Sequence, residues 1–314
     1  KRKMKMLVDL MELLVKIILI MGAGYFFAKK KIITPQVKQS LSTVLVHIVL
    51  YFSILSSSQQ ALNTEYLKGI LMVFLASSVY YAVSIPVMLG LGKAMGLSRG
   101  KKEIFTTMAV FANVGFIGFS MISEIVGEEG VLYAVAYNAA YNIFFFSWGL
   151  SLLAKGTGKT QKVSPKDILT NKMLLVSVLA IVFYMLPVRF PAFLSTTLSS
   201  VGGMMMPISM LVIGAEIAEM KVGDILRDKY SFAVSFLRLI AIPILMIPVV
   251  KLLSFSANTA MTFVVLSALP AGSLNVIMAQ EYRCEPEFAA RAVAQSMLLM
   301  LVTLPVVIML VKVI

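Results

Sequence analysis

The sequence has few of the residues on which enzymes and metal proteins depend. Its 314 residues include one histidine and one cysteine, and only 14% are charged. A single cysteine, Cys284, excludes a disulfide framework, and together with one histidine it excludes the usual zinc ligand sets. No His/Asp/Glu cluster, Ser/Lys pair or glycine-rich nucleotide loop is recognisable. We therefore expect no enzyme, no metal and no cofactor.

Apolar residues are abundant instead, at 59% of the chain. A soluble domain carries about 25% charged residues and cannot bury this much apolar surface, so the excess is expected to face lipid. Runs of roughly 20 apolar residues, long enough to cross a bilayer as a helix, recur along the chain. We predict an all-α polytopic membrane protein with ten transmembrane helices, near residues 7–28, 36–58, 66–92, 103–125, 131–154, 170–187, 191–217, 230–252, 259–281 and 288–312.

The net charge of +13 is distributed in short clusters between the apolar runs. Because these cations do not line one helix face, we expect no nucleic-acid partner. Cytoplasmic loops of membrane proteins retain Lys and Arg, and here the loops after the odd-numbered helices hold most of them, including residues 29–31, 93–102 and 155–166. We predict that these loops and Cys284 face the cytoplasm, with both termini outside the cell (inner) membrane. The basic N-terminal residues favour the opposite orientation, but the internal loops together carry more Lys and Arg, so we follow the loops.

The two halves of the chain follow the same hydropathy pattern when one is displaced by half the length. This offset places Gly115 on Gly272 and Asn138 on Gln295. An odd number of helices in each half would insert the second half upside down, which is typical of secondary transporters. We predict a first five-helix repeat over 1–154, a cytoplasmic linker over 155–169 and a second, inverted repeat over 170–314.

The fourth and ninth predicted helices contain Gly, Pro and amide residues near their middle, at 112–120 and 268–275. Gly costs about 1 kcal/mol and Pro about 3 kcal/mol in a helix, so both segments are predicted to unwind. Each break would create a half-helix N-terminus, whose free N–H groups suit a carboxylate. The alternative is that these residues merely allow close helix packing.

We predict that an organic carboxylate binds where the two breaks meet, with N–H groups after Gly118 and Gly272 and the amides of Asn113 and Asn275 as donors. The residues of this predicted site are Asn113, Gly115, Gly118, Ser120, Pro270, Gly272 and Asn275.

At these residues the sequence resembles the auxin efflux carrier family of membrane transporters. The matching segments are 111–121, 206–215, 237–243 and 269–282. The resemblance implies two inverted five-helix repeats, crossed broken helices 4 and 9, and a scaffold domain that moves against a panel of helices 1, 2, 6 and 7. It also implies export or exchange of small organic anions such as auxin, malonate or malate. Two features depart from the family pattern: Ser120 replaces a usual proline, and a helix 2 proline is missing near residues 50–53.

Two ionisable residues inside predicted spans are candidates for function, because a polar group in lipid needs a partner. His47 is either a packing residue bonded to a backbone carbonyl or a proton carrier. Arg238 either contacts the substrate anion or pairs with Glu216 or Glu219, and we expect the ion pair.

Amide side chains offer a third kind of candidate. Asn138 and Asn142, with Gln295 at the repeat position of Asn138, are expected to cap the broken helix ends. Alternatively, Glu281 coordinates a coupling sodium ion together with Gln280, Asn138 or Gln295 as oxygen ligands.

The function that the sequence supports best is secondary active transport of small organic anions by alternating access of the elevator type. A sodium-coupled symporter and a non-transporting ligand sensor on the same fold are the alternatives. The expected partners are a small organic carboxylate and the lipid bilayer, and a homodimer is left open.

Overall fold

The computed structural model describes residues 2–158, 170, 172–186, 189–219 and 228–312. The described part is helical throughout, apart from turns, short connections and one isolated β-bridge. The helices of the first half are α1 (Arg2–Lys29), α2 (Pro35–Val44), η1 (Leu45–Val49), α3 (Leu50–Ser57), α4 (Thr64–Ala94), α5 (Arg99–Val110), η2 (Val114–Gly118), α6 (Phe119–Ile125), α7 (Glu128–Phe144), η3 (Phe145–Gly149) and α8 (Leu150–Gly156). Those of the second half are α10 (Lys172–Met185), α11 (Ala192–Gly202), α12 (Met205–Glu219), α14 (Lys229–Phe236), η4 (Leu237–Ala241), α15 (Ile242–Leu252), α16 (Ala257–Ser267), α17 (Ser273–Tyr282) and α18 (Pro286–Lys312). The η segments are single π-helical turns.

Several helices begin where a polar side chain accepts a backbone N–H of the first turn. Thr34, Asn63, Asp228 and Ser256 cap α2, α4, α14 and α16 in this way. Such caps satisfy donors that have no partner within the helix. The starts of these helices are therefore determined by local sequence.

Five helices of the described residues are long and apolar enough to cross a membrane: Pro35–Ser57, Thr64–Ala94, Ala192–Glu219, Lys229–Leu252 and Pro286–Lys312. They coincide with the second, third, seventh, eighth and tenth predicted spans. Shorter apolar helices, Val114–Ile125, Lys172–Met185 and Ala257–Ser267, overlap the fourth, sixth and ninth. The full set of ten spans remains a prediction.

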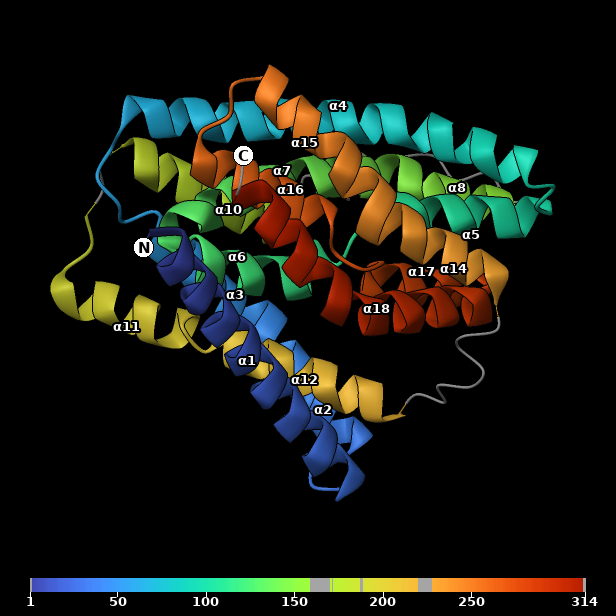
Figure 1. The fold of residues 1–314 in the computed structure, drawn as a ribbon, viewed down its shortest axis with the longest axis horizontal. Coiled ribbons are helices and arrows are strands. Elements are labelled where there is room, and N and C mark those ends of the chain that lie inside the picture. The colour runs from blue at the N-terminus through green and yellow to red at the C-terminus, as the bar shows by residue number, and fades with distance from the viewer. Residues whose placement is uncertain (1, 159–169, 171, 187–188, 220–227, 313–314) are drawn as a thin grey trace.

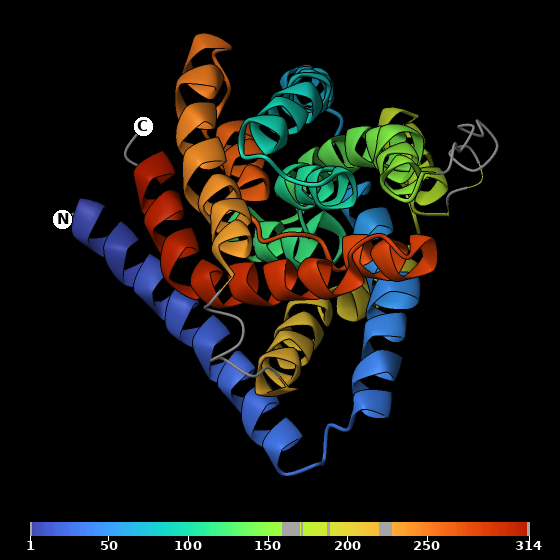
Figure 2. The ribbon, with the colours of Figure 1, turned by 90° about the vertical axis from the view of Figure 1, so that its right-hand side faces the viewer.

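The helices form two groups in space. In both views α1, α2 and α12 lie together on one side of the molecule, and most of the remaining helices pack on the other (Figures 1 and 2). Helix α1 packs along α12, α3 along α11, and α10 against α3. In the larger group, α5, α7 and α16 are buried on all faces over most of their length. These three helices form the centre of the protein.

The only cysteine of the sequence lies in the turn between α17 and α18. Cys284 is buried, and its Sγ lies 3.6 Å from the Gly100 carbonyl oxygen, to which it donates. Burial, and then the nearby Glu285 and Glu103 carboxylates, raise the pKa of this thiol to about 11. A covered and protonated thiol reacts poorly with thiol reagents, so labelling of Cys284 reports its burial and not its side of the membrane.

Topology is instead testable with cysteines placed at exposed positions in a Cys284→Ala background. Ala61 lies in the α3–α4 connection and Ala94 ends α4, and both are exposed. Because the Lys/Arg distribution predicts that the first is outside and the second in the cytoplasm, a membrane-impermeant maleimide is expected to label Ala61→Cys in intact cells. Ala94→Cys should react only after permeabilisation. The reverse pattern would invert the predicted topology.

Candidate functional site

Two helices are interrupted at the centre of the protein, and the interruptions pair with each other. Helix α5 ends at Val110 and η2 begins at Val114, while α16 ends at Ser267 and α17 begins at Ser273. Between these ends the two segments of the chain run antiparallel and form a β-bridge between Ala112 and Ala271. The bridge supplies partners for backbone groups that have left their helices, which buried backbone requires.

Two hydrogen bonds form this bridge. The Asn113 N–H donates to the Pro270 carbonyl oxygen at 2.9 Å, and the Gly272 N–H donates to the Phe111 carbonyl oxygen at 3.0 Å. A Cβ atom on Gly272 would lie 2.9 Å from the Ala112 oxygen, so the chains can approach this closely only at a glycine. The Ala271 N–H donates to Ser296 Oγ of α18 at 3.1 Å. The paired segments 111–113 and 270–272, which we call the crossing, are thus tied to a third helix.

The predicted position of the first half-helix N-terminus is wrong. The helix restarts at Val114, and its first acceptor is the Asn113 carbonyl oxygen, which receives the N–H groups of Ile117 and Gly118. The N–H after Gly118, that of Phe119, bonds to the Val114 oxygen and is not free. The bridge ends α5 earlier than the glycines would, and Gly118 serves close packing: a Cβ there would lie 2.8 Å from the Leu266 side chain.

The two predicted amide donors have different roles. Asn113 is 5% exposed, and its Nδ2 donates to Ser273 Oγ at 3.1 Å. This bond joins the residue just before η2 to the first residue of α17. Asn275 is fully buried, and its Nδ2 donates to the Phe111 oxygen at 2.9 Å. Its Oδ1 has no partner among the residues that the structure describes. Asn275 therefore holds the crossing together, and Asn113 is the amide nearest an accessible surface.

The N-terminal ends of η2 and α17 lie together on the partly accessible side of the crossing. Gly115, Phe116, Ser273 and Leu274 are all partly exposed there, and a Cβ on Gly115 would have no atom within 4 Å beyond its chain neighbours and the backbone of its own helix. The first N–H groups of a helix have no partner within it, and they carry partial positive charge. Two such ends with one amide between them can receive a small anion. Ser273 was not among the predicted residues, although its place directly after Gly272 is the signal that could have found it.

The C-terminal ends of α5 and α16 converge on Arg238, a fully buried residue of η4. Nη1 donates to the carbonyl oxygens of Val110 (3.0 Å) and Ala109 (3.4 Å). Nε donates to the Leu269 oxygen at 3.1 Å, and Nη2 to the Ser267 oxygen at 3.2 Å.

A hydroxyl completes the surroundings of the guanidinium. Nη1 of Arg238 also donates to the Tyr80 hydroxyl at 2.9 Å, and Tyr80 in turn lies 3.3 Å from the Val110 oxygen, to which it donates. The expected ion pair of Arg238 with Glu216 or Glu219 is wrong. Glu219 pairs with Lys38 of α2. The guanidinium of Arg238 instead donates to backbone carbonyl groups that have no helical partner at the two interruptions.

Two further predicted residues lie apart from the bridge. Ser120 bonds through Oγ to the Phe116 oxygen at 3.0 Å, within its own helix, and to the Met205 oxygen at 3.5 Å, at the start of α12. His47 is exposed in η1 and has no hydrogen bond within the described ranges; its nearest ring contact is Tyr51, at 6.4 Å. The bond to a backbone carbonyl, one of the two roles predicted for His47, is therefore absent from the described residues.

The predicted ion ligands differ in accessibility. Glu281 is exposed near the end of α17, whereas Asn138 and Gln295 are buried. The backbone carbonyl oxygen of Asn138 accepts from Asn142 Nδ2 at 2.8 Å, and the side-chain Oε1 of Gln295 accepts from Ser235 Oγ at 3.2 Å. The Asn138 side chain forms no hydrogen bond to a helix end among the described residues, and its Nδ2 is buried without a partner there.

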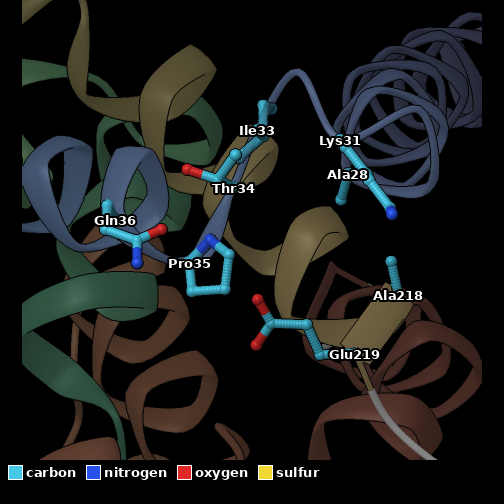
Figure 3. A pocket seen from close by; sticks show the side chains of 8 residues that line it. All are labelled: Ala28, Lys31, Ile33, Thr34, Pro35, Gln36, Ala218 and Glu219. Atoms are coloured by element: carbon cyan, nitrogen blue, oxygen red, sulfur yellow. The ribbon is translucent and has the colours of Figure 1, made fainter.

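A cavity of about 320 Å³ lies away from the crossing, where α1 and α12 end and α2 begins. Figure 3 shows the side chains of Lys31, Gln36 and Glu219 around it, together with Thr34 and Pro35 at the start of α2. It shares no lining residue with the crossing. It is therefore a separate feature, near the loop that carries Lys29–Lys31.

Long apolar helices and a backbone crossing buried between them define a multi-pass membrane protein. Residues 9–308 match the family described as "Membrane transport protein". The chain belongs to this family, the auxin efflux carrier family, so the resemblance seen in its sequence motifs is confirmed. It is also 21% identical over 296 residues, covering 94% of this chain and 96% of the relative, to an uncharacterized transporter of Methanothermobacter thermautotrophicus.

Proposed function

We propose that the protein is a secondary active transporter of small organic anions, and that it binds the substrate carboxylate at the N-terminal ends of η2 and α17. The observation that carries this proposal is the hydrogen bond between Asn113 and Ser273, which brings the two ends together on the accessible side of the crossing. Helix N-termini attract carboxylates through free N–H groups and partial positive charge.

The chemistry of this site suits transport. Its donors are the neutral Asn113 amide, the Ser273 hydroxyl and backbone N–H groups. The buried cation Arg238 is not among them, because its N–H groups donate to carbonyl oxygens that precede the bridge. Neutral donors recognise a carboxylate and still release it, whereas a desolvated ion pair would hold it more tightly.

The architecture that we propose is ten transmembrane helices in two inverted repeats, with an elevator-type motion. The packing of α1 on α12 and of α3 on α11 and α10 supports one stationary group of helices. An ion pair of 2.6 Å between Lys16 of α1 and Glu124 of α6 joins the two groups, and such a contact would break and re-form during motion. We place the protein in the cell inner membrane with both termini outside, on the distribution of Lys and Arg.

Removal of the Asn113 amide tests this site. Asn113→Ala is expected to weaken binding of malonate, malate or indole-3-acetate by on the order of 1.5–3 kcal/mol, the usual range for a hydrogen bond to a charged group. Isothermal titration calorimetry on purified protein measures the affinity, and uptake into proteoliposomes measures transport.

Two variants serve as controls for this measurement. Asn258→Ala removes an exposed amide that bonds to Glu129 at 3.0 Å, away from the crossing, and should leave the affinity unchanged. Ser273→Ala removes the partner of Asn113 and keeps the amide, so it should cost less than Asn113→Ala. Equal affinity in Asn113→Ala and the unaltered protein would move the site elsewhere, and failure of all three acids to bind would contradict the proposed substrate class.

A further inference from the structure

Arg238 is a buried cation without an anionic partner. Among the described residues it is the largest fully buried side chain, and no carboxylate lies within ion-pair distance of it. An uncompensated charge in a protein interior is strongly destabilising. The groups that surround the guanidinium must therefore supply negative potential.

Two helix C-termini supply it. Each C-terminus carries a partial charge of roughly −0.5, so α5 and α16 together offer about one negative charge. The carbonyl oxygens that Arg238 contacts belong to residues 109 and 110 at the end of α5, and to residues 267 and 269 at and just after the end of α16. The single positive charge of arginine balances this potential, and its planar group of five N–H donors reaches both ends at once.

The guanidinium lies on the side of the bridge opposite the proposed substrate site. Its carbonyl partners come before the bridge residues Ala112 and Ala271 in the chain, whereas η2 and α17 come after them. The segments between these carbonyls and the new helix starts are only a few residues long. A displacement of either C-terminus is thus passed through the bridge to Asn113 and Ser273.

We propose that Arg238 is a positioning residue for the crossing: it fixes the C-terminal ends of α5 and α16 and thereby the relative placement of Asn113 and Ser273. It also attaches the helix formed by α14, η4 and α15 to the crossing, so that this helix moves with the site. The effect on substrate affinity rests on the proposed function. The effect on the bridge does not.

Arg238→Lys keeps the charge and removes the planar donor group, so that not all carbonyl partners can be bonded at once. Backbone amide hydrogen exchange of residues 111–113, 271 and 272 should accelerate at least about tenfold, because the Asn113 and Gly272 N–H groups are protected by the bridge. Exchange in α1 and α12 should not change. Arg291→Lys, at a partly exposed arginine near Asp228 and Glu287, is the matched control and should leave the bridge amides as they are.

A double-variant cycle with malonate as the probe distinguishes positioning from direct contact. If Arg238 acts through Asn113, Arg238→Lys should lower malonate affinity about tenfold in the unaltered protein and markedly less in the Asn113→Ala background. Equal losses in both backgrounds would mean that Arg238 contacts the anion itself and would overturn the proposal.

The hydrogen-exchange measurement tests the positioning role of Arg238 without any ligand. Unchanged exchange at the bridge, or acceleration spread over the whole protein, would overturn the positioning role. Acceleration confined to the bridge, in a protein that does not bind malonate, would support the role of Arg238 and count against malonate as a substrate.

Discussion

Replacing Arg238 by methionine is expected to be among the most damaging single changes in this protein. Arg238→Met keeps much of the side-chain length and loses every donor, which leaves carbonyl oxygens of α5 and α16 buried without their cation. Each buried polar group that loses its partner costs about 1–3 kcal/mol, so the expected loss of unfolding free energy is on the order of 3–5 kcal/mol. Thermal unfolding in detergent, followed by size-exclusion chromatography of the surviving fraction, measures it.

The control for this change is Arg291→Met. Arg291 is partly exposed, and its ion pairs with Asp228 (3.4 Å) and Glu287 (3.7 Å) lie near the surface. Exposed ion pairs contribute about 0–1 kcal/mol, so this variant should unfold close to the temperature of the unaltered protein. A melting temperature of Arg238→Met equal to that of Arg291→Met would show that the buried guanidinium does not stabilise the crossing.

A methyl group added at Gly24 is expected to force α1 away from α12. A Cβ atom on Gly24 would lie 2.2 Å from the Leu211 carbonyl oxygen, and one on Gly214 would lie 2.0 Å from the Met21 oxygen. Both obstacles are backbone atoms in helices, so no side chain can rotate out of the way. In membrane helices such small residues allow the backbones to touch. Gly24→Ala should therefore destabilise the protein by on the order of 3 kcal/mol.

Gly22 provides a matched control on the same helix. It is exposed, and a Cβ there meets no atom within 4 Å. Because alanine favours a helix over glycine by about 1 kcal/mol, Gly22→Ala is expected to be neutral or slightly stabilising. The measurement is thermal unfolding of both variants in one detergent. Equal stability of Gly22→Ala and Gly24→Ala would contradict the close approach of α1 and α12.

The crossing illustrates how far sequence reasoning reaches. Gly, Pro and amide residues at corresponding places in the two halves indicated where backbone would leave the helix, and the structure has interruptions near both places. The sequence did not indicate the residue at which the helix begins again after the interruption. The start at Val114, in place of one after Gly118, follows from the bridge to Ala271, a residue far away in the chain.

Arg238 and Cys284 show the same limit. An ion pair was the natural expectation for a buried arginine, since sequence proximity to Glu216 and Glu219 was the only available guide. Its actual acceptors are 29 to 158 residues distant along the chain. Cys284 stands in a polar, charged segment and would be expected to be accessible, yet the turn between α17 and α18 packs its thiol against the start of α5.

The sequence by itself determined the class of this protein, a multi-pass membrane protein of the auxin efflux carrier family. The length of an apolar run, the charges beside it and the order of short motifs are local properties that any reader of the chain can measure. The tertiary structure alone decided which carbonyl groups surround Arg238, which amide holds the crossing and which lies near an accessible surface. Those roles depend on two helix interruptions meeting in space, and that meeting is a property of the packed molecule.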